Sequence, residues 1–575
     1  MTDRVTTSGR GAHRSGAPWR NPYPLIILAL LVLAGLLTVP APLANDIRYE
    51  IGTHAVSQFS VTETFSHRPL MHRLIMELFF APSYALSNDR VGFEIVMRVL
   101  AIALSALAAA VLWSGMRRRL PRLASPVAVA SLAGLLLPST GVAWEPDWLA
   151  VVLTVAGVGL CFWRRPVGPI LGGVIFAVAA VLKFVTLPIA MIGLLAVLLL
   201  KERPWLGTWP RTLREVPQAL RQLDRSDLLQ RPVIIATLAA IVTGIAWLVL
   251  LVTVWPWEIP WLLDASKMQP LRPLGPKTAL TFELLGNSMI MWPAIALVPA
   301  ALVSATKVEK GVVIGSLVLA WIPMQLQNQF FPYHLAAFPV IGSIALVLGL
   351  RRGGRWLAAY ALIGGVGSVI ALTMISPPVR IAWVWAFIAA WVVYAAVGVL
   401  LQRRLVATRT GSANRRLSAL ATLLGVLLLV PVSLPAAKWS FTMDPSRYFS
   451  TNHSLDVNKS LLSSGAAIRG RIGPDTPVLY FGFGDLVYAV GNPTFCKYPT
   501  NVFVQRGQWE KPVLPTATYA DNLKCLDDPR NEYLVWDHDY VTDWRQPPEV
   551  MEIVDRNFDC REAFQYGLMM VCPRR

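Results

Sequence analysis

The stretch 43-LANDIRYEIGTHAVSQFSVTETFSHRPLMHR-73 directly follows residues 23–43, an apolar segment long enough to cross a membrane. It carries an unusual density of ionisable side chains, which are Asp46, Arg48, Glu50, His54, Glu63, His67, Arg68, His72 and Arg73. A plain connecting loop needs none of them. The task of this stretch therefore depends on the side of the membrane it occupies and on which other segments reach the same side.

The composition is that of a membrane protein with many spans. Of the 575 residues, 55% are hydrophobic and only 15% are charged, whereas a soluble protein carries about 25% charged residues. The formal net charge is +18. The basic residues form short clusters between apolar runs. This pattern is typical of topology signals and argues against nucleic-acid binding as the cause of the positive charge.

The apolar runs predict about thirteen transmembrane helices, several of them close to the lower limit of roughly 17 residues for a spanning helix. Their ranges are 23–43, 92–115, 124–141, 147–163, 167–183, 184–200, 233–254, 284–304, 311–327, 333–350, 356–375, 381–401 and 417–436. Together they define a membrane domain over residues 23–436.

The basic clusters set the orientation of these helices. Residues 1–22 form a basic leader rich in Ser, Gly and Thr, which we expect to be disordered, and no small-residue cleavage site follows the first apolar run. Basic residues recur in alternate loops, at 117–122, 164–165, 201–231, 307–310, 351–355 and 403–416. The positive-inside rule therefore places the N-terminus in the cytoplasm, and an odd number of spans places the C-terminal end outside.

Residues 437–575 lack long apolar runs and predict a small extracytoplasmic α/β domain. Strands are expected within 476-TPVLYFGFGDLVYAVG-491 and 531-NEYLVWDHDY-540. Four of the five cysteines lie in this domain, Cys496, Cys525, Cys560 and Cys572. An even set outside the cytoplasm predicts two disulfides, with three possible pairings. The domain could grip an acceptor, pack over the outer loops or serve as a structural cap.

Other loops on the predicted outer side also carry ionisable side chains. Glu145 and Asp147 lie in 141-GVAWEPDW-148, Lys183 lies at the end of a short span, and Tyr333 and His334 lie in 325-QLQNQFFPYHLAAFP-339. A further loop, 254–283, is rich in Trp. Because charged groups at membrane depth are costly, their gathering on one face indicates a functional site.

Acids and bases at an outer membrane surface suit group transfer from a lipid carrier. A carboxylate can take the proton of an acceptor hydroxyl. Arg, Lys and His can hold a phosphate and neutralise its charge as it leaves. Since nucleotide sugars are not supplied outside the cytoplasm, the arrangement favours a sugar linked to a lipid phosphate as the donor.

This layout resembles the GT-C superfamily of membrane glycosyltransferases, which use polyprenyl-phosphate sugars and have an acidic residue in the first outer loop. Asp46 matches that acid, Arg68-Pro69-Leu70 resembles the juxtamembrane motif, and Lys183 resembles the Lys at a span end. Tyr333 and His334 resemble the Tyr-His of the late outer loop. The resemblance implies an α-helical polytopic membrane protein with about thirteen transmembrane helices and a small C-terminal α/β domain.

The resemblance also implies roles for the site residues. Asp46 would be the general base of an inverting transfer, with Glu50 and Glu63 as the alternatives. The residues expected to bind phosphate and sugar are Arg68, Arg73, His67, Lys183, Tyr333, His334, Glu145 and Asp147. Arg48 stands where many members have a second acid, so we predict no metal ligands and no required cofactor, with a divalent metal left open.

The predicted function is transfer of mannose or arabinose from a polyprenyl-phosphate donor to a lipid or glycan acceptor of the cell envelope. Usage rich in Arg, Ala and Val favours a bacterial plasma membrane as the location. The partners are then the donor, the acceptor and the bilayer, with no nucleic acid, and the oligomeric state is not predicted. The alternatives are a flippase or a ligase for lipid-linked glycans, or a non-catalytic scaffold.

Overall fold

The structure is a computed structural model. It describes residues 43–64, 68–87, 89–120, 142–163, 166–202, 231–267, 306–327, 332–338, 382–406, 451–482, 485–499, 516–537 and 546–575, with scattered positions at 29–39, 124–136, 278–302, 340–348 and 363–379. The predicted leader 1–22 and the predicted span 417–436 lie outside the described residues.

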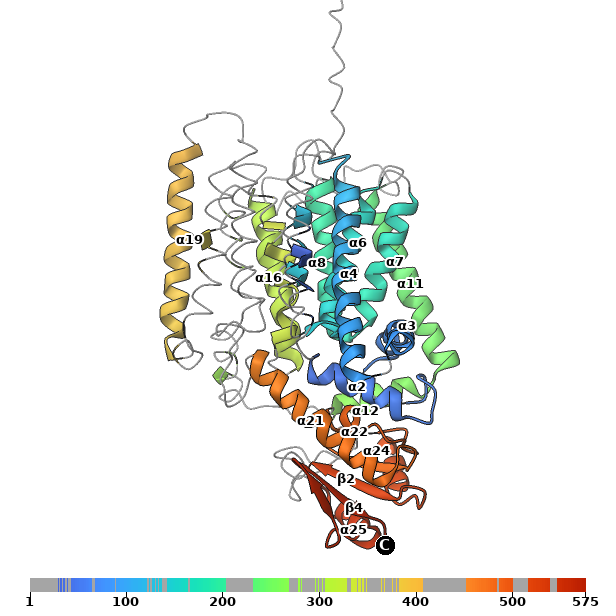
Figure 1. Cartoon of the computed structure of the whole chain (residues 1–575). Coiled ribbons are helices and arrows are strands. Elements are labelled where there is room, and N and C mark those ends of the chain that lie inside the picture. Colours follow the sequence, from blue (N-terminus) through green and yellow to red (C-terminus); the bar gives the residue numbers. More distant parts are fainter. Residues whose placement is uncertain are drawn as a thin grey trace, which may run out of the picture.

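Upright helices form a bundle in Figure 1. They are α4 (Arg90–Met116), α6 (Pro146–Cys161), α7 (Val167–Val181), α8 (Leu187–Val197), α11 (Pro232–Val254), α16 (Lys307–Gln327) and α19 (Val384–Val406). Among the described residues, α4 and α11 are long and apolar enough to cross a membrane, and α6, α7 and α8 are shorter apolar helices. The total of about thirteen spans stays a prediction.

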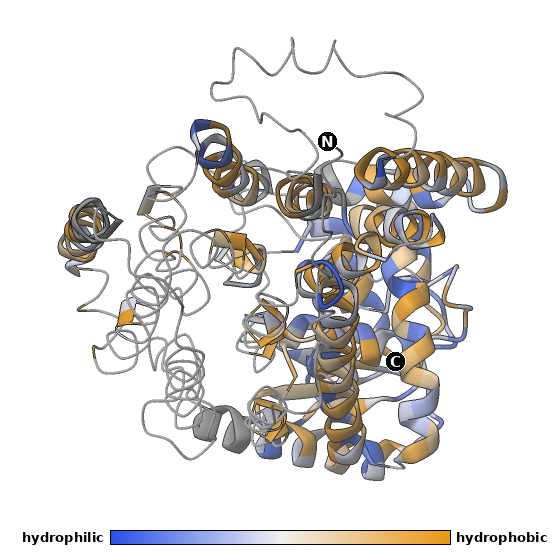
Figure 2. Cartoon of the chain, turned by 90° about the horizontal axis from the view of Figure 1, so that it is seen from above, coloured by the Kyte–Doolittle hydropathy of each residue, from blue (hydrophilic) through white to orange (hydrophobic). Residues whose placement is uncertain are grey.

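Glycines let the central helices approach closely. A Cβ on Gly159 of α6 would lie 2.6 Å from the backbone nitrogen of Leu112 in α4. Small residues at such crossings allow the backbone contact that packs helices in a bilayer. The outer face of α11 is apolar and exposed, with Ile241, Val242 and Ile245 more than half exposed (52%, 66% and 58%). Figure 2 shows this apolar character on the outside of the bundle, as expected for helices that face lipid.

The stretch 43–73 contributes to two short helices at one end of the bundle. They are α2 (Asn45–Val56) and α3 (Leu70–Leu86), and α3 runs crosswise to the upright helices (Figure 1). Glu94 of α4 anchors the chain just before α2, because its carboxylate accepts a hydrogen bond from the backbone nitrogen of Leu43 at 2.9 Å. Helix α12 (Glu258–Lys267) lies at the same end.

The C-terminal region, residues 451–575, contains helices and one sheet below the bundle in Figure 1. Its elements are α21 (Thr451–Ile472), β1 (Val478–Phe481), α22 (Asp485–Val490), α24 (Ala517–Leu526), β2 (Tyr533–Asp537), α25 (Pro548–Asn557), β3 (Phe564–Tyr566) and β4 (Met569–Pro573). The strand order is β1-β2-β4-β3, with β1 parallel to β2 and the other pairs antiparallel. Both predicted strands are present, although 476–491 divides into β1 and α22.

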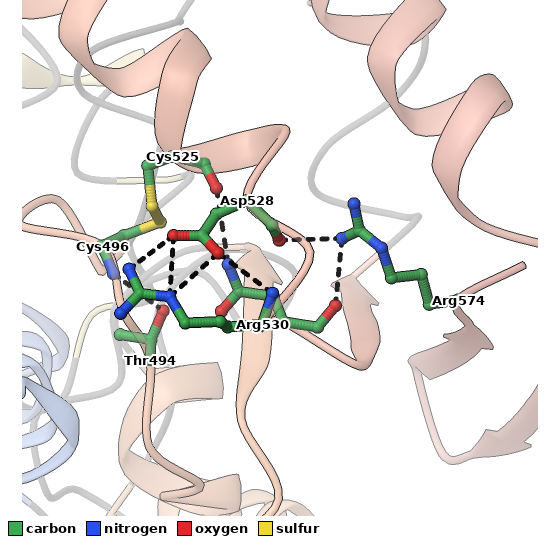
Figure 3. Close-up of a disulfide and its surroundings, with 7 residues drawn as sticks. Thr494, Cys496, Cys525, Asp528, Arg530 and Arg574 are labelled. Carbon is green, nitrogen blue, oxygen red and sulfur yellow. Dashed lines mark hydrogen bonds and ion pairs between the residues drawn. A yellow bond between two sulfur atoms is a disulfide. The ribbon is translucent and has the colours of Figure 1, made fainter.

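The four cysteines of this region form two disulfides. Cys496 pairs with Cys525 across 29 residues, and Cys560 pairs with Cys572 across 12. The structure therefore decides between the three pairings that the sequence left open. Figure 3 shows the first disulfide beside Asp528, which is held by Arg530, while Arg574 donates to the Asp528 backbone carbonyl. Cys161 in α6 is buried and lies outside both disulfides.

Candidate active site

A single guanidinium group lies at the centre of the site. Arg68, just before α3, contacts the carboxylates of Asp46 at 3.0 Å, Glu50 at 3.0 Å and Glu145 at 2.8 Å. These four residues are called the Arg68 cluster below. Asp46 and Glu50 are one helical turn apart in α2, so both carboxylates lie on the same face of the helix. Glu145 comes from the start of α6.

The Arg68 side chain is buried, and the three carboxylates around it differ in exposure. Burial alone would lower the pKa of Arg68, but the carboxylates of Glu145, Asp46 and Glu50 outweigh burial and raise it, so Arg68 stays a cation. The Asp46 side chain is 22% exposed, whereas those of Glu50 and Glu145 are 4% and 0% exposed. Asp46 is therefore the carboxylate of this cluster that an incoming molecule can reach.

A second segment fixes the direction of the Asp46 carboxylate. Tyr333 lies in the short 3-10 helix η5 (Pro332–Leu335), and its hydroxyl donates to Asp46 Oδ2 at 3.2 Å. Arg68 Nη2 donates to the same oxygen at 3.0 Å. Two donors on Oδ2 leave Oδ1 as the oxygen better placed to accept a proton.

Lys183, Asp147 and His334 form a neighbouring polar group. Lys183 precedes the 3-10 helix η2 (Phe184–Thr186), and its Nζ lies 3.8 Å from Asp147 Oδ2. His334 Nδ1 lies 3.5 Å from the other oxygen of Asp147. The Lys183 ammonium also lies 5.8 Å from the centre of the ring of Tyr333, the residue whose hydroxyl donates to Asp46. Its side chain is 13% exposed, against 0% for His334.

Arg73 lies beside the Arg68 cluster and has a structural role. Its Nη1 donates to the carbonyls of Val61 at 2.6 Å and Thr64 at 2.8 Å, and its Nη2 pairs with Glu258 of α12. Glu258 also accepts from the backbone nitrogen of Leu70 at 2.7 Å, at the first turn of α3. This position suits a carboxylate, because the free N–H groups of a helix start carry partial positive charge. Arg73 and Glu258 thus fix α3 against α12.

Two residues outside the predicted set of site residues occupy the core of the site. His72 lies between Glu50, at 3.2 Å from Nδ1, and the backbone carbonyl of Trp144, at 2.9 Å from Nε2. Trp144 is fully buried and has a φ of +75°, an unusual backbone conformation for a residue other than glycine. Strained backbone of this kind is concentrated at functional sites. Trp144 directly precedes Glu145, and its backbone conformation therefore helps to direct the Glu145 carboxylate towards Arg68.

The predicted site residues therefore fall into three groups. The structure brings together Asp46, Arg68, Glu145 and Tyr333, and beside them Asp147, Lys183 and His334. Arg73 contacts the Arg68 cluster through the backbone carbonyl of Arg68. His67 is outside the described residues. Within the described part of the chain, no group of three His, Cys, Asp or Glu side chains is arranged to hold a metal ion.

The comparisons with known proteins concern the fold. No protein-family model and no curated protein matches the sequence. The structure is similar to the crystal structure of ArnT from Cupriavidus metallidurans in the apo state, with a TM-score of 0.53 and 13% identity over 95% of this chain and 97% of that one. The chain has a GT-C fold.

Two further structures share parts of this likeness. One is the same ArnT bound to undecaprenyl phosphate, with a TM-score of 0.46 and 14% identity over 95% of this chain and 97% of that one. The other is arabinosyltransferase EmbB from Mycobacterium smegmatis, with a TM-score of 0.39 and 14% identity over 81% of this chain and 44% of that one. The likeness to apo ArnT confirms, as a fold, the GT-C resemblance predicted from the sequence.

Proposed function

We propose that this protein is a membrane glycosyltransferase that moves a sugar from a polyprenyl-phosphate donor to an acceptor hydroxyl. The observation that carries the proposal is Asp46, a partly exposed carboxylate held by Arg68 and Tyr333, with the Lys183 ammonium 5.8 Å from the centre of the Tyr333 ring. A base and a cation side by side are what transfer from a phosphate leaving group requires. The GT-C fold shared with ArnT supports the same reaction class.

In the proposed reaction the acceptor oxygen attacks the anomeric carbon of the sugar. Asp46 takes the hydroxyl proton as the new carbon–oxygen bond forms. The bond between the anomeric carbon and the phosphate oxygen breaks, and the polyprenyl phosphate leaves with the electron pair. A single displacement of this kind inverts the anomeric centre.

We assign the phosphate contact to Lys183, because its ammonium is the more exposed of the cations near Asp46. Asp147, which His334 contacts on its other oxygen, would hold Lys183 in place. For Arg68 and Arg73 we revise the predicted phosphate contact. Their side chains are 3% and 5% exposed, and their guanidinium groups already contact carboxylates and carbonyls. We therefore propose that they hold α2, α3 and α12 in place relative to one another.

The donor carrier to test first is undecaprenyl phosphate, because the ArnT that shares this fold also has a structure bound to it. Mannose and arabinose remain the proposed sugars, and a cell-envelope lipid or glycan the proposed acceptor. The orientation proposed from the basic loops places the site outside the cytoplasm, at the plasma membrane of a bacterium.

The experiment that tests the function uses the purified full chain in lipid nanodiscs. It is incubated with labelled polyprenyl-phosphate mannose or arabinose and with a membrane lipid extract as acceptor. We expect one donor to yield a labelled product that Asp46→Asn does not make. Absence of product from either donor, with each donor shown to bind, would count against transfer and favour a flippase or a ligase.

A further inference from the structure

The C-terminal region is docked directly onto the helix that carries the proposed base. Helix α22 packs along α2, and a Cβ added to Gly52 of α2 would lie 2.6 Å from the backbone nitrogen of Tyr488. The chain just after α2 pairs with this region as well, since Thr494 donates its backbone N–H to the Val56 carbonyl at 3.0 Å. Figure 1 shows α22 directly below α2.

A buried arginine forms the polar centre of this contact. Arg48 is 3% exposed and lies two residues after Asp46 in α2. Its Nε donates to Glu94 of α4 at 3.0 Å, and its Nη2 donates to Asn458 of α21. Its Nη1 lies 3.9 Å from Asp485 at the start of α22. Arg48 therefore joins the bundle, the catalytic helix and the C-terminal region.

The rest of the contact surrounds Arg48 closely. Its guanidinium lies 5.6 Å from the centre of the Tyr488 ring, and Arg90 of α4 lies 5.2 Å from the same ring. The Tyr488 hydroxyl donates to the Arg90 carbonyl at 2.9 Å. A planar guanidinium with fixed donors suits such a junction, because each of its edges can hold a different partner in one geometry.

We propose that Arg48 is a positioning residue through which the docked C-terminal region fixes the direction of the Asp46 carboxylate. The physical reason is that Arg48 and Asp46 move together as parts of one rigid helix. Residues 46 and 48 are in the first turn of α2, so a rotation of the helix that releases Arg48 also displaces Asp46 from Arg68 and Tyr333. Misplacement of a reacting group by about 1 Å can lower a rate by about 100-fold.

This inference rests on the proposed function, and it separates the C-terminal region from the alternative of an acceptor-gripping module. A module that only grips the acceptor would change the KM for the acceptor. A region that aims the base changes kcat and leaves donor affinity unchanged. A structural cap changes only stability.

The test compares four variants of the full chain in nanodiscs. Asp485→Asn keeps the shape and removes the charge that faces Arg48, Arg48→Lys keeps a cation without the fork of donors, and Gly52→Ala forces α2 away from Tyr488. The matched control is Asp527→Asn, which removes an exposed ion pair with Arg556 elsewhere in the C-terminal region. The readouts are kcat, KM for donor and acceptor, affinity for undecaprenyl phosphate, and hydrogen exchange of the amides of residues 45–56.

We expect the first three variants to exchange faster in residues 45–56 and to lose about 10- to 100-fold in kcat, with affinity for undecaprenyl phosphate within about two-fold of wild type. Asp527→Asn should match wild type in every readout. Unchanged exchange and kcat in both Asp485→Asn and Gly52→Ala, or a change confined to the acceptor KM, would overturn the proposal. If wild type transfers no sugar, the proposed function fails, and the exchange of residues 45–56 still decides whether Arg48 and α22 hold this helix.

Discussion

The hydroxyl of Tyr333 donates to the carboxylate of Asp46 across 3.2 Å, and this contact joins segments that lie 287 residues apart in the chain. One segment follows the first predicted span and the other precedes a late one. The contact has a chemical consequence, because a base that is held by two donors presents one defined oxygen to the acceptor.

Asp46→Asn should abolish sugar transfer, with a loss of at least about 100-fold. The amide cannot take a proton, yet it keeps the size of the carboxyl group and one acceptor oxygen for Arg68. The measurement is the initial rate with labelled donor in nanodiscs, together with the melting temperature. Glu63→Gln is the matched control, since Glu63 is an exposed acid of the same stretch that contacts Ser60. Wild-type rates in Asp46→Asn would remove Asp46 from the mechanism.

Tyr333→Phe should lower kcat by about 10-fold while leaving the melting temperature nearly unchanged, because it deletes one hydrogen bond and keeps the ring. The ring still packs against Lys183 and His334. Tyr566→Phe, in the C-terminal region away from the site, serves as the control. If both substitutions leave kcat at the wild-type value, the Tyr333 hydroxyl does not position the base.

Lys183→Met should raise the donor KM and lower kcat/KM by about 100-fold, because the phosphate loses its nearest cation. Lys183→Arg should recover part of the loss. Lys459→Met removes an exposed lysine of α21 and should behave as wild type. Binding of undecaprenyl phosphate, measured separately, should weaken most in Lys183→Met, less in Lys183→Arg, and not in Lys459→Met. Equal affinity in all three variants would assign the phosphate to another cation.

Asp485 should make stability depend on pH in a defined direction. Burial raises the pKa of Asp485 to about 6, against the attraction of Arg48, while Glu94, Asp46 and Asp537 add repulsion. The folded chain then binds a proton that the unfolded chain releases, so stability falls as the pH rises from about 4 to about 6. The melting temperature of Asp485→Asn minus that of wild type should therefore increase over this window. A constant difference from pH 4 to pH 7 would contradict the assignment.

Loss of the Cys496–Cys525 disulfide should destabilise the C-terminal region. The bond closes a segment of 29 residues, and the chain-entropy model gives about 3–4 kcal/mol for a loop of this length. The double variant Cys496→Ala/Cys525→Ala should unfold this region at a lower temperature and expose it to protease. Cys161→Ala is the control, because Cys161 forms no disulfide. Equal protease resistance in both would show that packing alone holds this region.

Much of the architecture follows from local patterns. The apolar runs predicted α4, α6, α7 and α11 to within a few residues. In lipid the backbone must satisfy its own hydrogen bonds within a helix, and the side chains of that helix must be apolar over its whole length. The two strands 478–481 and 533–537 were also predicted, from β-branched and aromatic residues. The helix over 45–56 was not predicted, because the contact of Glu94 with Leu43, just before α2, is not local.

The site was partly predicted for the same reason. Asp46, Lys183, Tyr333 and His334 were found as ionisable or polar groups at the ends of apolar runs. His72 and Trp144 were left out of the predicted set of site residues, because they are joined by a hydrogen bond between α3 and the turn before α6. Arg68 and Arg73 were assigned to phosphate, since a sequence shows a cation but not the carboxylates that neutralise it.

The sequence by itself determined that this chain crosses a membrane, that its ionisable residues gather at one end, and that four cysteines lie in a polar C-terminal region. Each of these is a property of composition and spacing along the chain. The tertiary structure alone decided which cysteines pair, that Arg68 binds three carboxylates, and that Arg48 joins α2 to the C-terminal region. These depend on distances between residues far apart in sequence, which packing sets and no local pattern encodes.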